Sequence, residues 1–423
     1  MVSAELNSDK TIYESRLTEL LKETPIVDTH NDFPYILRVQ LHDELHSCDF
    51  DFNGELQTHT SLPKFRKGKL GVQFFSVYIE CKDYITEDGK EDFNKFNSAV
   101  RDTLEQIDVT KRLVNEYSDD MKFVNNSIEA MEAYKNGKIA VTLGVEGLHQ
   151  VDLSLGVLRE YFELGCRYIT LTHNGDNPFA TAASSIAAGL PDNGLTEYGK
   201  RCILEMNRLG MMVDLSHVSY KTMLDTLEVT QSPVIFSHSS AYHLTNHERN
   251  VRDDVLLKIK ENDGVVCVNF YPAFIVPKDK SIKEVSIEDA VNHILHIVKI
   301  TGSFRHVGFG SDFDGIPFGP IGLEDVSKYP DLIYKIMQAG ATDQDIKGLM
   351  GGNTMRVWAK NEEISKKLIK KLGPKGIIED NWKQRVWEFN SYSKDFPRLF
   401  ENSFDIHKDS TIWKPKKDMF TKK

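Results

Sequence analysis

Cysteine is scarce in this chain, and its few cysteines form no close pairs. The sequence contains 5 cysteines, scattered from Cys48 to Cys267, and none belongs to a C-x-x-C pair. An odd, dispersed set of this kind does not predict a disulfide framework. Cys166 and Cys267 fall within apolar runs, where thiols pack as small hydrophobic side chains. The cysteine usage therefore favours a reducing compartment.

Long apolar runs and an excess of positive charge are also lacking. No stretch approaches the roughly 20 continuous apolar residues of a membrane-spanning helix. Residues 1–7 have neither the basic nor the apolar region of a secretory signal, and the C-terminus has no apolar tail for a lipid anchor. The net charge of -11 argues against a nucleic-acid partner, because that binding depends on clustered Lys and Arg. We expect no membrane anchor and a cytoplasmic location.

The chain also lacks linkers and repeats that would divide it. Of its 423 residues 40% are hydrophobic and 27% are charged, which is typical of a soluble protein with a large core. We expect one catalytic domain over residues 25–391, preceded by a helical extension (residues 1–24) and followed by a tail (residues 392–423). The polar stretch 83–92 is expected to be a surface insertion.

Short apolar runs alternate with helical patterns along most of the sequence. Runs rich in β-branched residues predict about eight buried strands, and amphipathic stretches such as 196–209 and 287–300 separate most of them. This alternation favours an α/β protein with a (β/α)8 TIM barrel. The expected strands lie near residues 25–30, 70–79, 138–145, 166–173, 210–216, 233–238, 264–270 and 306–311.

Residues that bind divalent metals stand at the carboxyl ends of these expected strands. In a (β/α)8 barrel the chemistry gathers at that end, so such side chains should converge. A single histidine there is more often a hydrogen-bonded core residue. A whole set is hard to explain as packing, because buried charges without partners are costly. Imidazole and carboxylate together predict zinc or a similar ion. The set comprises His30, Asp32, Glu146, His217, His238 and Asp312.

The spacing of these residues suggests which of them bind metal and which acts as the base. His30 and Asp32 are two apart, so a regular strand would point both to one face. Glu146 can bridge their ion to a second one held by the remaining histidines, and two ions about 3.5–4 Å apart would activate a shared water for hydrolysis. Asp312 is placed to act as the base. Asp28 and Asp314 compete for that role, and Asp28 could instead orient His30.

At these residues the sequence resembles the renal (membrane) dipeptidase-type zinc metallopeptidases, a branch of the amidohydrolase-like barrels. The resemblance runs from about residue 25 to about residue 361 and becomes specific only when its motifs are taken together. They are DTHNDFP, GVEG, DLSHVS, FSHSSAY and VGFGSDFDGIPFGPIGLEDVSKYPDL.

The resemblance implies a binuclear zinc dipeptidase. It assigns His30 and Asp32 to the first zinc and Glu146 to the bridge between the ions. It assigns the second zinc to the histidines of DLSHVS and FSHSSAY, and hydrolysis to a hydroxide shared by both ions. It also implies substrate contacts from His173 in LTHN and Arg249 in ERNV, with Arg249 on the terminal carboxylate. Relatives form homodimers, which we expect here.

Departures from the family and competing interpretations remain open. Cys81 resembles a half-cystine of the secreted relatives, but Gly175 stands where its partner is expected, which puts that disulfide in doubt. A mononuclear deaminase would use His30, one further histidine and Asp312 around one ion, whereas Glu146 favours two ions. Some relatives open β-lactams or process peptide conjugates, so these are alternative substrates. A non-catalytic barrel is disfavoured because the ligands and the base are all present.

Overall fold

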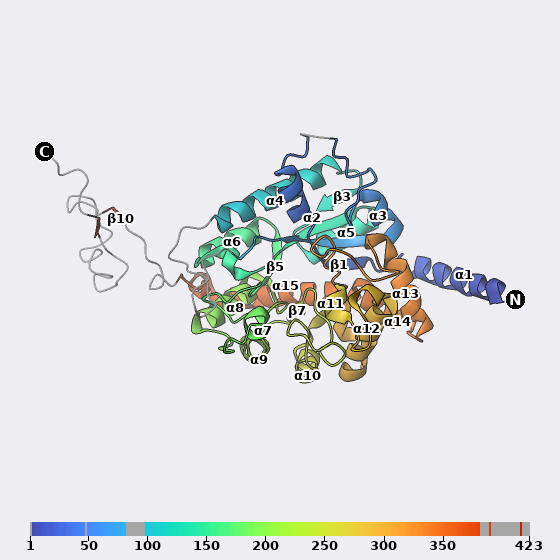
Figure 1. Ribbon diagram of the computed structural model, residues 1–423. Coiled ribbons are helices and arrows are strands. Elements are labelled where there is room, and N and C mark those ends of the chain that lie inside the picture. The colour runs from blue at the N-terminus through green and yellow to red at the C-terminus, as the bar shows by residue number, and fades with distance from the viewer. Residues whose placement is uncertain (1, 47–48, 82–97, 381–388, 391–414, 417–423) are drawn as a thin grey trace.

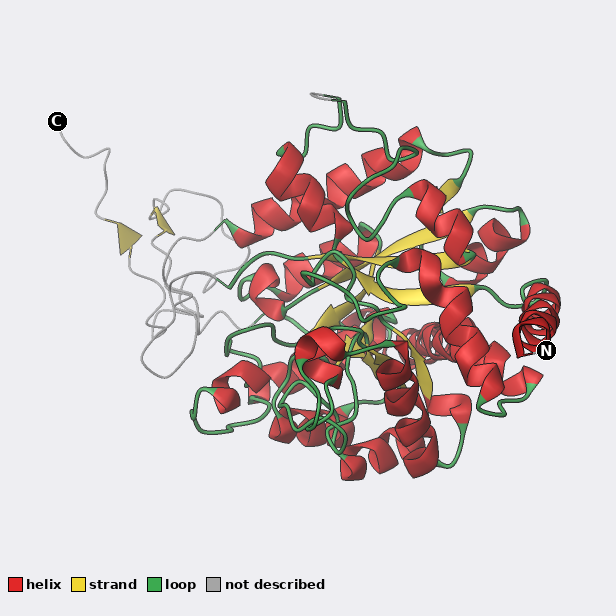
Figure 2. Ribbon diagram, turned by 45° about the vertical axis from the view of Figure 1, so that its right-hand side comes forward, coloured by secondary structure: helices red, strands yellow, loops and turns green. Residues whose placement is uncertain are grey.

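Parallel strands surrounded by helices form the body of the protein (Figures 1 and 2). The computed structural model describes residues 2–46, 49–81, 98–380, 389–390 and 415–416. Within these residues, eight parallel strands close into a barrel, which confirms the predicted (β/α)8 fold. The expected insertion at 83–92 and nearly all of the expected tail lie outside the described residues.

The barrel closes through the pairing of β2 with β4. Around it the strands follow the order β2-β1-β9-β8-β7-β6-β5-β4, and the expected strands all occur, several in shortened form. The sequence did not predict β3, which pairs with the first residues of β4. The strand bounds are β1 Ile26–Asn31, β2 Leu70–Val77, β3 Met121–Phe123, β4 Ile139–Val145, β5 Cys166–Thr170, β6 Met212–Asp214, β7 Ile235–Phe236, β8 Val265–Val268 and β9 Val307–Phe309. A separate pair is formed by β10 Phe389–Asn390 and β11 Pro415–Lys416.

Local capping signals set several helix boundaries. Ser286 and Asp289 form a capping box at the start of α12, and Gly302 ends that helix with a left-handed φ of 76°. The helices are α1 Val2–Leu20, α2 Phe33–Leu41, α3 Leu62–Gly68, α4 Ala99–Glu116, α5 Ser127–Lys135, α6 Leu155–Glu163, α7 Ala183–Ala187, α8 Glu197–Leu209, α9 Tyr220–Val229, α10 Asp253–Asn262, α11 Pro272–Ile275, α12 Ile287–Thr301, α13 Tyr329–Gln338, α14 Asp343–Lys347 and α15 Asn353–Leu372. None of these described helices combines the length and apolar character that crossing a membrane requires.

Two helices flank β1, and the sequence did not predict the second. Helix α1 projects from the body, while Leu17 and Leu20 in its last turns are buried (Figure 1). Helix α2 follows β1 almost directly. The N–H groups in the first turn of a helix have no partner within the helix, so Pro34, which has no N–H, costs nothing there. A proline at this position therefore favours the start of a helix directly after the strand.

The inside of the barrel is a packed apolar core that closes one end. Inward-facing residues of the strands cluster with α15, where the Trp358 ring meets Phe74 edge-on at a centroid distance of 5.1 Å. Tyr168 of β5 belongs to the same cluster, and its ring lies directly against the backbone of Gly144 on β4. The core thus fills the barrel beneath the carboxyl ends of the strands, where the polar residues gather.

We predict that Gly144→Ala destabilises the fold. An added Cβ would lie 1.9 Å from the Tyr168 ring, so that ring and the strands around it would have to move. Overpacking of this kind should lower the free energy of unfolding by about 2 kcal/mol or more, measured by denaturant titration. Gly156→Ala in α6 is the control, since its nearest contact is Ser154 Oγ at 3.2 Å. Equal stability of the two variants would contradict this packing argument.

Candidate metal centre

The first pair of expected ligands lies where β1 runs into α2. His30 is within β1 and Asp32 is the residue before α2, and their Nε2 and Oδ2 atoms are 3.3 Å apart. The two side chains do converge, but on an irregular strand, because the register of β1 against β2 shifts between Asp28 and Asn31. Irregularities of this kind re-aim side chains near functional sites.

Glu146, which directly follows β4, occupies the centre of the site. Its Oε1 lies 2.9 Å from Nε2 of His217, 3.3 Å from that of His238 and 3.5 Å from that of His30. The Nε2 of His173, beyond the end of β5, is 3.8 Å away. One carboxylate oxygen therefore faces imidazoles from four different strand ends.

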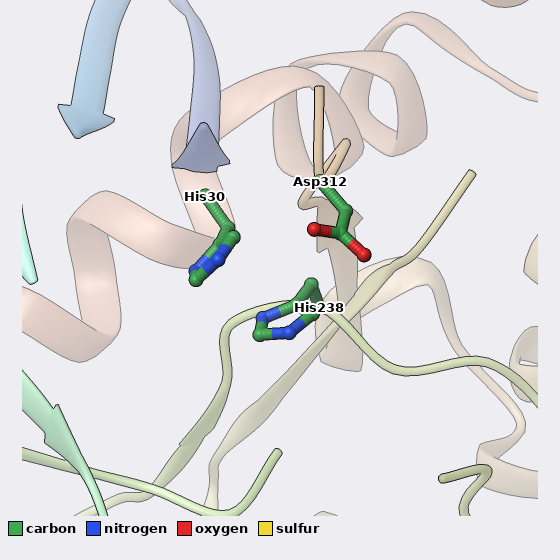
Figure 3. A group of neighbouring side chains, drawn as sticks. All are labelled: His30, His238 and Asp312. Atoms are coloured by element: carbon green, nitrogen blue, oxygen red, sulfur yellow. The ribbon is translucent and has the colours of Figure 1, made fainter. Parts of the chain in front are cut away.

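The ligand atoms group into overlapping sets of three. His30, Asp32 and Glu146 form one set, and Glu146, His217 and His238 form another, so Glu146 is common to both. A third set joins His30, His238 and Asp312, which point toward one another (Figure 3). In each set the ligand atoms lie within 4.8 Å of one another. All residues expected to bind metal are therefore brought together.

The donor chemistry of these sets fits a divalent ion. Imidazole nitrogens and carboxylate oxygens are the ligands that zinc takes in catalytic sites. His30 Nε2 and Asp32 Oδ1 are buried without a well-formed hydrogen bond among the described residues. Nε2 atoms of His217 and His238 also face each other at 2.9 Å, which is favourable only with a proton or a cation between them.

The charges of the site are strongly coupled. Burial disfavours a charged His30 imidazole, but the carboxylates of Asp32 and Glu146 outweigh this and raise its pKa to about 10. Burial and the nearby Asp32 raise the pKa of Asp312 to about 7. Burial also raises the pKa of Glu146 well above its usual value. A bound cation would compete with these protons for the same carboxylates.

Backbone geometry at the site is unusual. His217 and Asp312 both have φ of 65°, in the left-handed region that residues other than glycine seldom adopt. Gly315 packs against the acidic side: a Cβ there would lie 2.3 Å from Asp32 Oδ2 and 2.6 Å from Asp312 Oδ1. Glycine at this position lets the backbone approach both carboxylates closely.

A cavity of about 710 Å³ opens onto these ligands. Tyr271 and Phe274 line it, so the segment after β8 contributes to the pocket. His247 also lines it, and its ring packs on Phe274 at a centroid distance of 4.5 Å.

Arg249 is the cationic side chain of this cavity wall. It is only 5% exposed, and its guanidinium lies 5.3 Å from the centre of the Phe274 ring. Its hydrogen bonds, to Ser239 Oγ at 3.5 Å and to the His238 carbonyl at 3.4 Å, are long, and its Nε has no partner among the described residues. Burial lowers its pKa to about 10, so it stays charged at neutral pH. Arg249 can therefore bind an anion in the cavity.

Several supporting residues were not found from the sequence. Asn269, just after β8, donates to Asp312 Oδ2 at 2.9 Å, and its place after an apolar run was a usable signal. Tyr168 contacts Nδ1 of His30 at 2.9 Å, a place that Asp28 was considered for. The Asp28 carboxylate instead accepts hydrogen bonds from Ser311 and from the backbone N–H of His30.

Comparison with known proteins places this geometry in a family. Residues 14–371 match the family model described as membrane dipeptidase, peptidase family M19. The chain belongs to this family. It is accordingly a metallodipeptidase, and the resemblance inferred from its motifs is confirmed.

Relatives of this M19 dipeptidase agree in sequence and fold. A Schizosaccharomyces pombe protein described as an uncharacterized dipeptidase is 58% identical over 416 residues, covering 97% of this chain and 98% of that protein. The crystal structure of dipeptidase AC, an M19 metallopeptidase, has a TM-score of 0.70 and 25% identity, covering 80% and 98% of the two chains. A Rhodobacter sphaeroides metallopeptidase, solved with a phosphinate mimic of the dipeptide L-Ala-D-Ala, has a TM-score of 0.69 and 24% identity, covering 80% and 99%, and supports the fold alone.

Proposed function

We propose that this M19 dipeptidase is a binuclear zinc enzyme in which Glu146 bridges the two ions. The observation that carries the proposal is the position of Glu146 Oε1, which is shared by two separate ligand sets. In this proposal His30 and Asp32 complete the first set, and His217 and His238 complete the second. When bound, the two ions would polarise the scissile carbonyl and lower the pKa of the attacking water.

Residues around the ligands would handle the protons and the developing charge. Asp312, held by Asn269, would take the proton of the attacking water and pass it to the leaving amine. Burial and the neighbouring Asp32 raise the pKa of Asp312 above that of an ordinary carboxyl, which favours its taking up a proton. Burial keeps the pKa of His173 well below its usual value, so the ring is neutral and can donate one N–H to the developing oxyanion.

Arg249 would bind the substrate's terminal carboxylate. Its guanidinium lies in the cavity wall with weak hydrogen bonds and an unpartnered Nε, and a planar fork matches carboxylate geometry. A substrate fixed at one end by Arg249 and at the other by the metal-binding residues must be short, which favours dipeptides. The homodimer and the cytoplasmic location expected from the sequence stay predictions.

A mononuclear site is the second candidate. His30, His238 and Asp312 form a ligand set of their own, which is the arrangement expected for a deaminase (Figure 3). In that case Asp312 would bind the ion and Glu146 would have no bridging role. The number of ions per chain distinguishes the two arrangements.

We expect the purified protein to hold about two zinc ions per chain and to hydrolyse unblocked dipeptides. Chelation should abolish this activity, and added zinc should restore it. The measurement combines elemental analysis with a dipeptide panel on the same preparation, including β-lactam and peptide-conjugate substrates. One ion per chain would favour the mononuclear site. Two ions without dipeptide cleavage would keep the site and overturn the substrate.

Asp312→Asn should retain both zinc ions but lose about 10²- to 10⁴-fold in kcat, because the amide cannot accept the proton. Asp314→Asn is the matched control. Asp314 accepts a hydrogen bond from the His59 N–H, which an asparagine oxygen can replace, so its kcat should fall far less. Comparable loss in both variants, measured at saturating substrate, would remove Asp312 as the specific base.

Arg249→Ala should raise KM for dipeptides with a free carboxylate by about 10- to 100-fold, the range expected when a charged hydrogen-bond partner is lost. C-terminally amidated dipeptides, which we expect to be poor substrates of the wild type, should be affected much less. The control is Arg252→Ala, since Arg252 is a nearby arginine that pairs with Glu248 and packs on Tyr242. If the wild type processes free and amidated dipeptides equally, the carboxylate contact is absent.

A further inference from the structure

Two of the expected zinc ligands have a hydroxyl group behind the ring. His30 and His238 come from different ligand sets, and their rings lie 3.7 Å apart between centroids. On the side away from Glu146, His30 Nδ1 lies 2.9 Å from the Tyr168 hydroxyl, and His238 Nδ1 lies 2.8 Å from Ser237 Oγ. A hydroxyl has one hydrogen to donate. If that hydrogen goes to another acceptor, the hydroxyl oxygen must accept from the ring, and the ring proton is then on Nδ1.

The Tyr168 hydroxyl also lies 2.9 Å from the carbonyl oxygen of Thr29. A carbonyl can only accept, so this contact uses the single hydrogen of Tyr168. The Tyr168 oxygen must then accept a hydrogen bond from His30 Nδ1–H. With its proton on Nδ1, a neutral His30 has a bare lone pair on Nε2, the atom that faces Asp32 and Glu146.

Ser237 fixes His238 in the same way. Its Oγ lies 2.6 Å from Asp214 Oδ2, the charged acceptor within its reach, and therefore donates there and accepts from His238 Nδ1–H. Asp214 is fully buried and is held in place by Thr170 Oγ1 at 2.6 Å and by the backbone N–H groups of Ser216 and Ser237. His238 is left with a bare Nε2 that faces Glu146 at 3.3 Å.

His217 shows that this arrangement is specific to the other two rings. Its Nδ1 is buried and has no hydrogen-bond partner in the described part of the chain. His217 itself has a left-handed backbone, with φ of 65°, and its Nε2 lies 2.9 Å from Glu146 Oε1. Hydroxyl groups therefore support one histidine in each ligand set, while the third histidine has none.

We propose that Tyr168 and Ser237, with Asp214 behind Ser237, are positioning residues for the zinc ligands. They hold His30 and His238 in the tautomer whose Nε2 binds metal, and none of the three belongs to a ligand set. The inference rests on the proposed zinc site. Partners of this kind fix ring orientation and raise ligand basicity, and their loss typically weakens metal binding about 10- to 100-fold.

The test is zinc affinity, measured by competition with a chromogenic chelator on the full chain. Tyr168→Phe removes only the hydroxyl, and Tyr161→Phe is its control, because the Tyr161 hydroxyl is equally buried but donates to Gln150 O away from the site. Ser237→Val and Ser237→Thr form a second pair, since they have the same shape and only threonine keeps a hydroxyl. The melting temperature of each zinc-free variant is recorded alongside.

We expect Tyr168→Phe and Ser237→Val to bind zinc about 10- to 100-fold more weakly than their partners Tyr161→Phe and Ser237→Thr, at similar melting temperatures of the zinc-free proteins. Equal zinc affinity within both pairs would overturn the positioning role while leaving the zinc site intact. A wild type that binds no zinc would overturn the proposed function itself. If Ser237→Val does not fold, the tyrosine pair decides.

Discussion

A single buried carboxylate oxygen sets the constraint on which the site depends. Glu146 Oε1 has imidazole nitrogens of His217, His238, His30 and His173 within 3.8 Å, and the Glu146 side chain is almost fully buried. Removing a carboxylate from water is costly unless positive charge replaces the lost hydration. A proton on Glu146, protons on the histidines or a bound cation can relieve this cost. The two ligand sets that share Glu146 favour the cation, so this cluster is organised around cation binding.

The two ends of the barrel differ in composition: one end is filled by apolar side chains, and the other carries the ligand sets. Trp358 and the inward-facing strand residues fill one end with closely packed apolar side chains, which makes the strand positions rigid. Tyr168 connects the two ends, because its ring belongs to that core and its hydroxyl touches His30. Gly144 leaves the space for that ring. Core packing thus determines where a candidate metal ligand sits, since a shift of the ring would move the hydroxyl with it.

The sequence predicts the strands and the ligands of this protein better than their supporting contacts. Apolar runs ending in His30, Glu146 or Asp312 could be identified because strand, strand end and functional residue are adjacent in sequence. Contacts across the barrel could not: Tyr168 and His30 are 138 positions apart, and their meeting depends on the irregular register of β1. Helix α2 was missed for a local reason, since it starts without the loop that normally separates strand from helix.

Asp28 was considered as a base or as a partner of the His30 ring, but its carboxylate has a different role. Its carboxylate accepts hydrogen bonds from the Ser311 N–H and hydroxyl, at 3.0 and 2.7 Å, and so ties the end of β9 to β1. The next residue, Asp312, donates its N–H to the His30 carbonyl at 3.1 Å while its φ is 65°. A left-handed backbone at a non-glycine residue costs about 1–3 kcal/mol and persists only where the surroundings determine it. Asp28 supplies part of that determination, so it supports the proposed base through the backbone and not through the ring of His30.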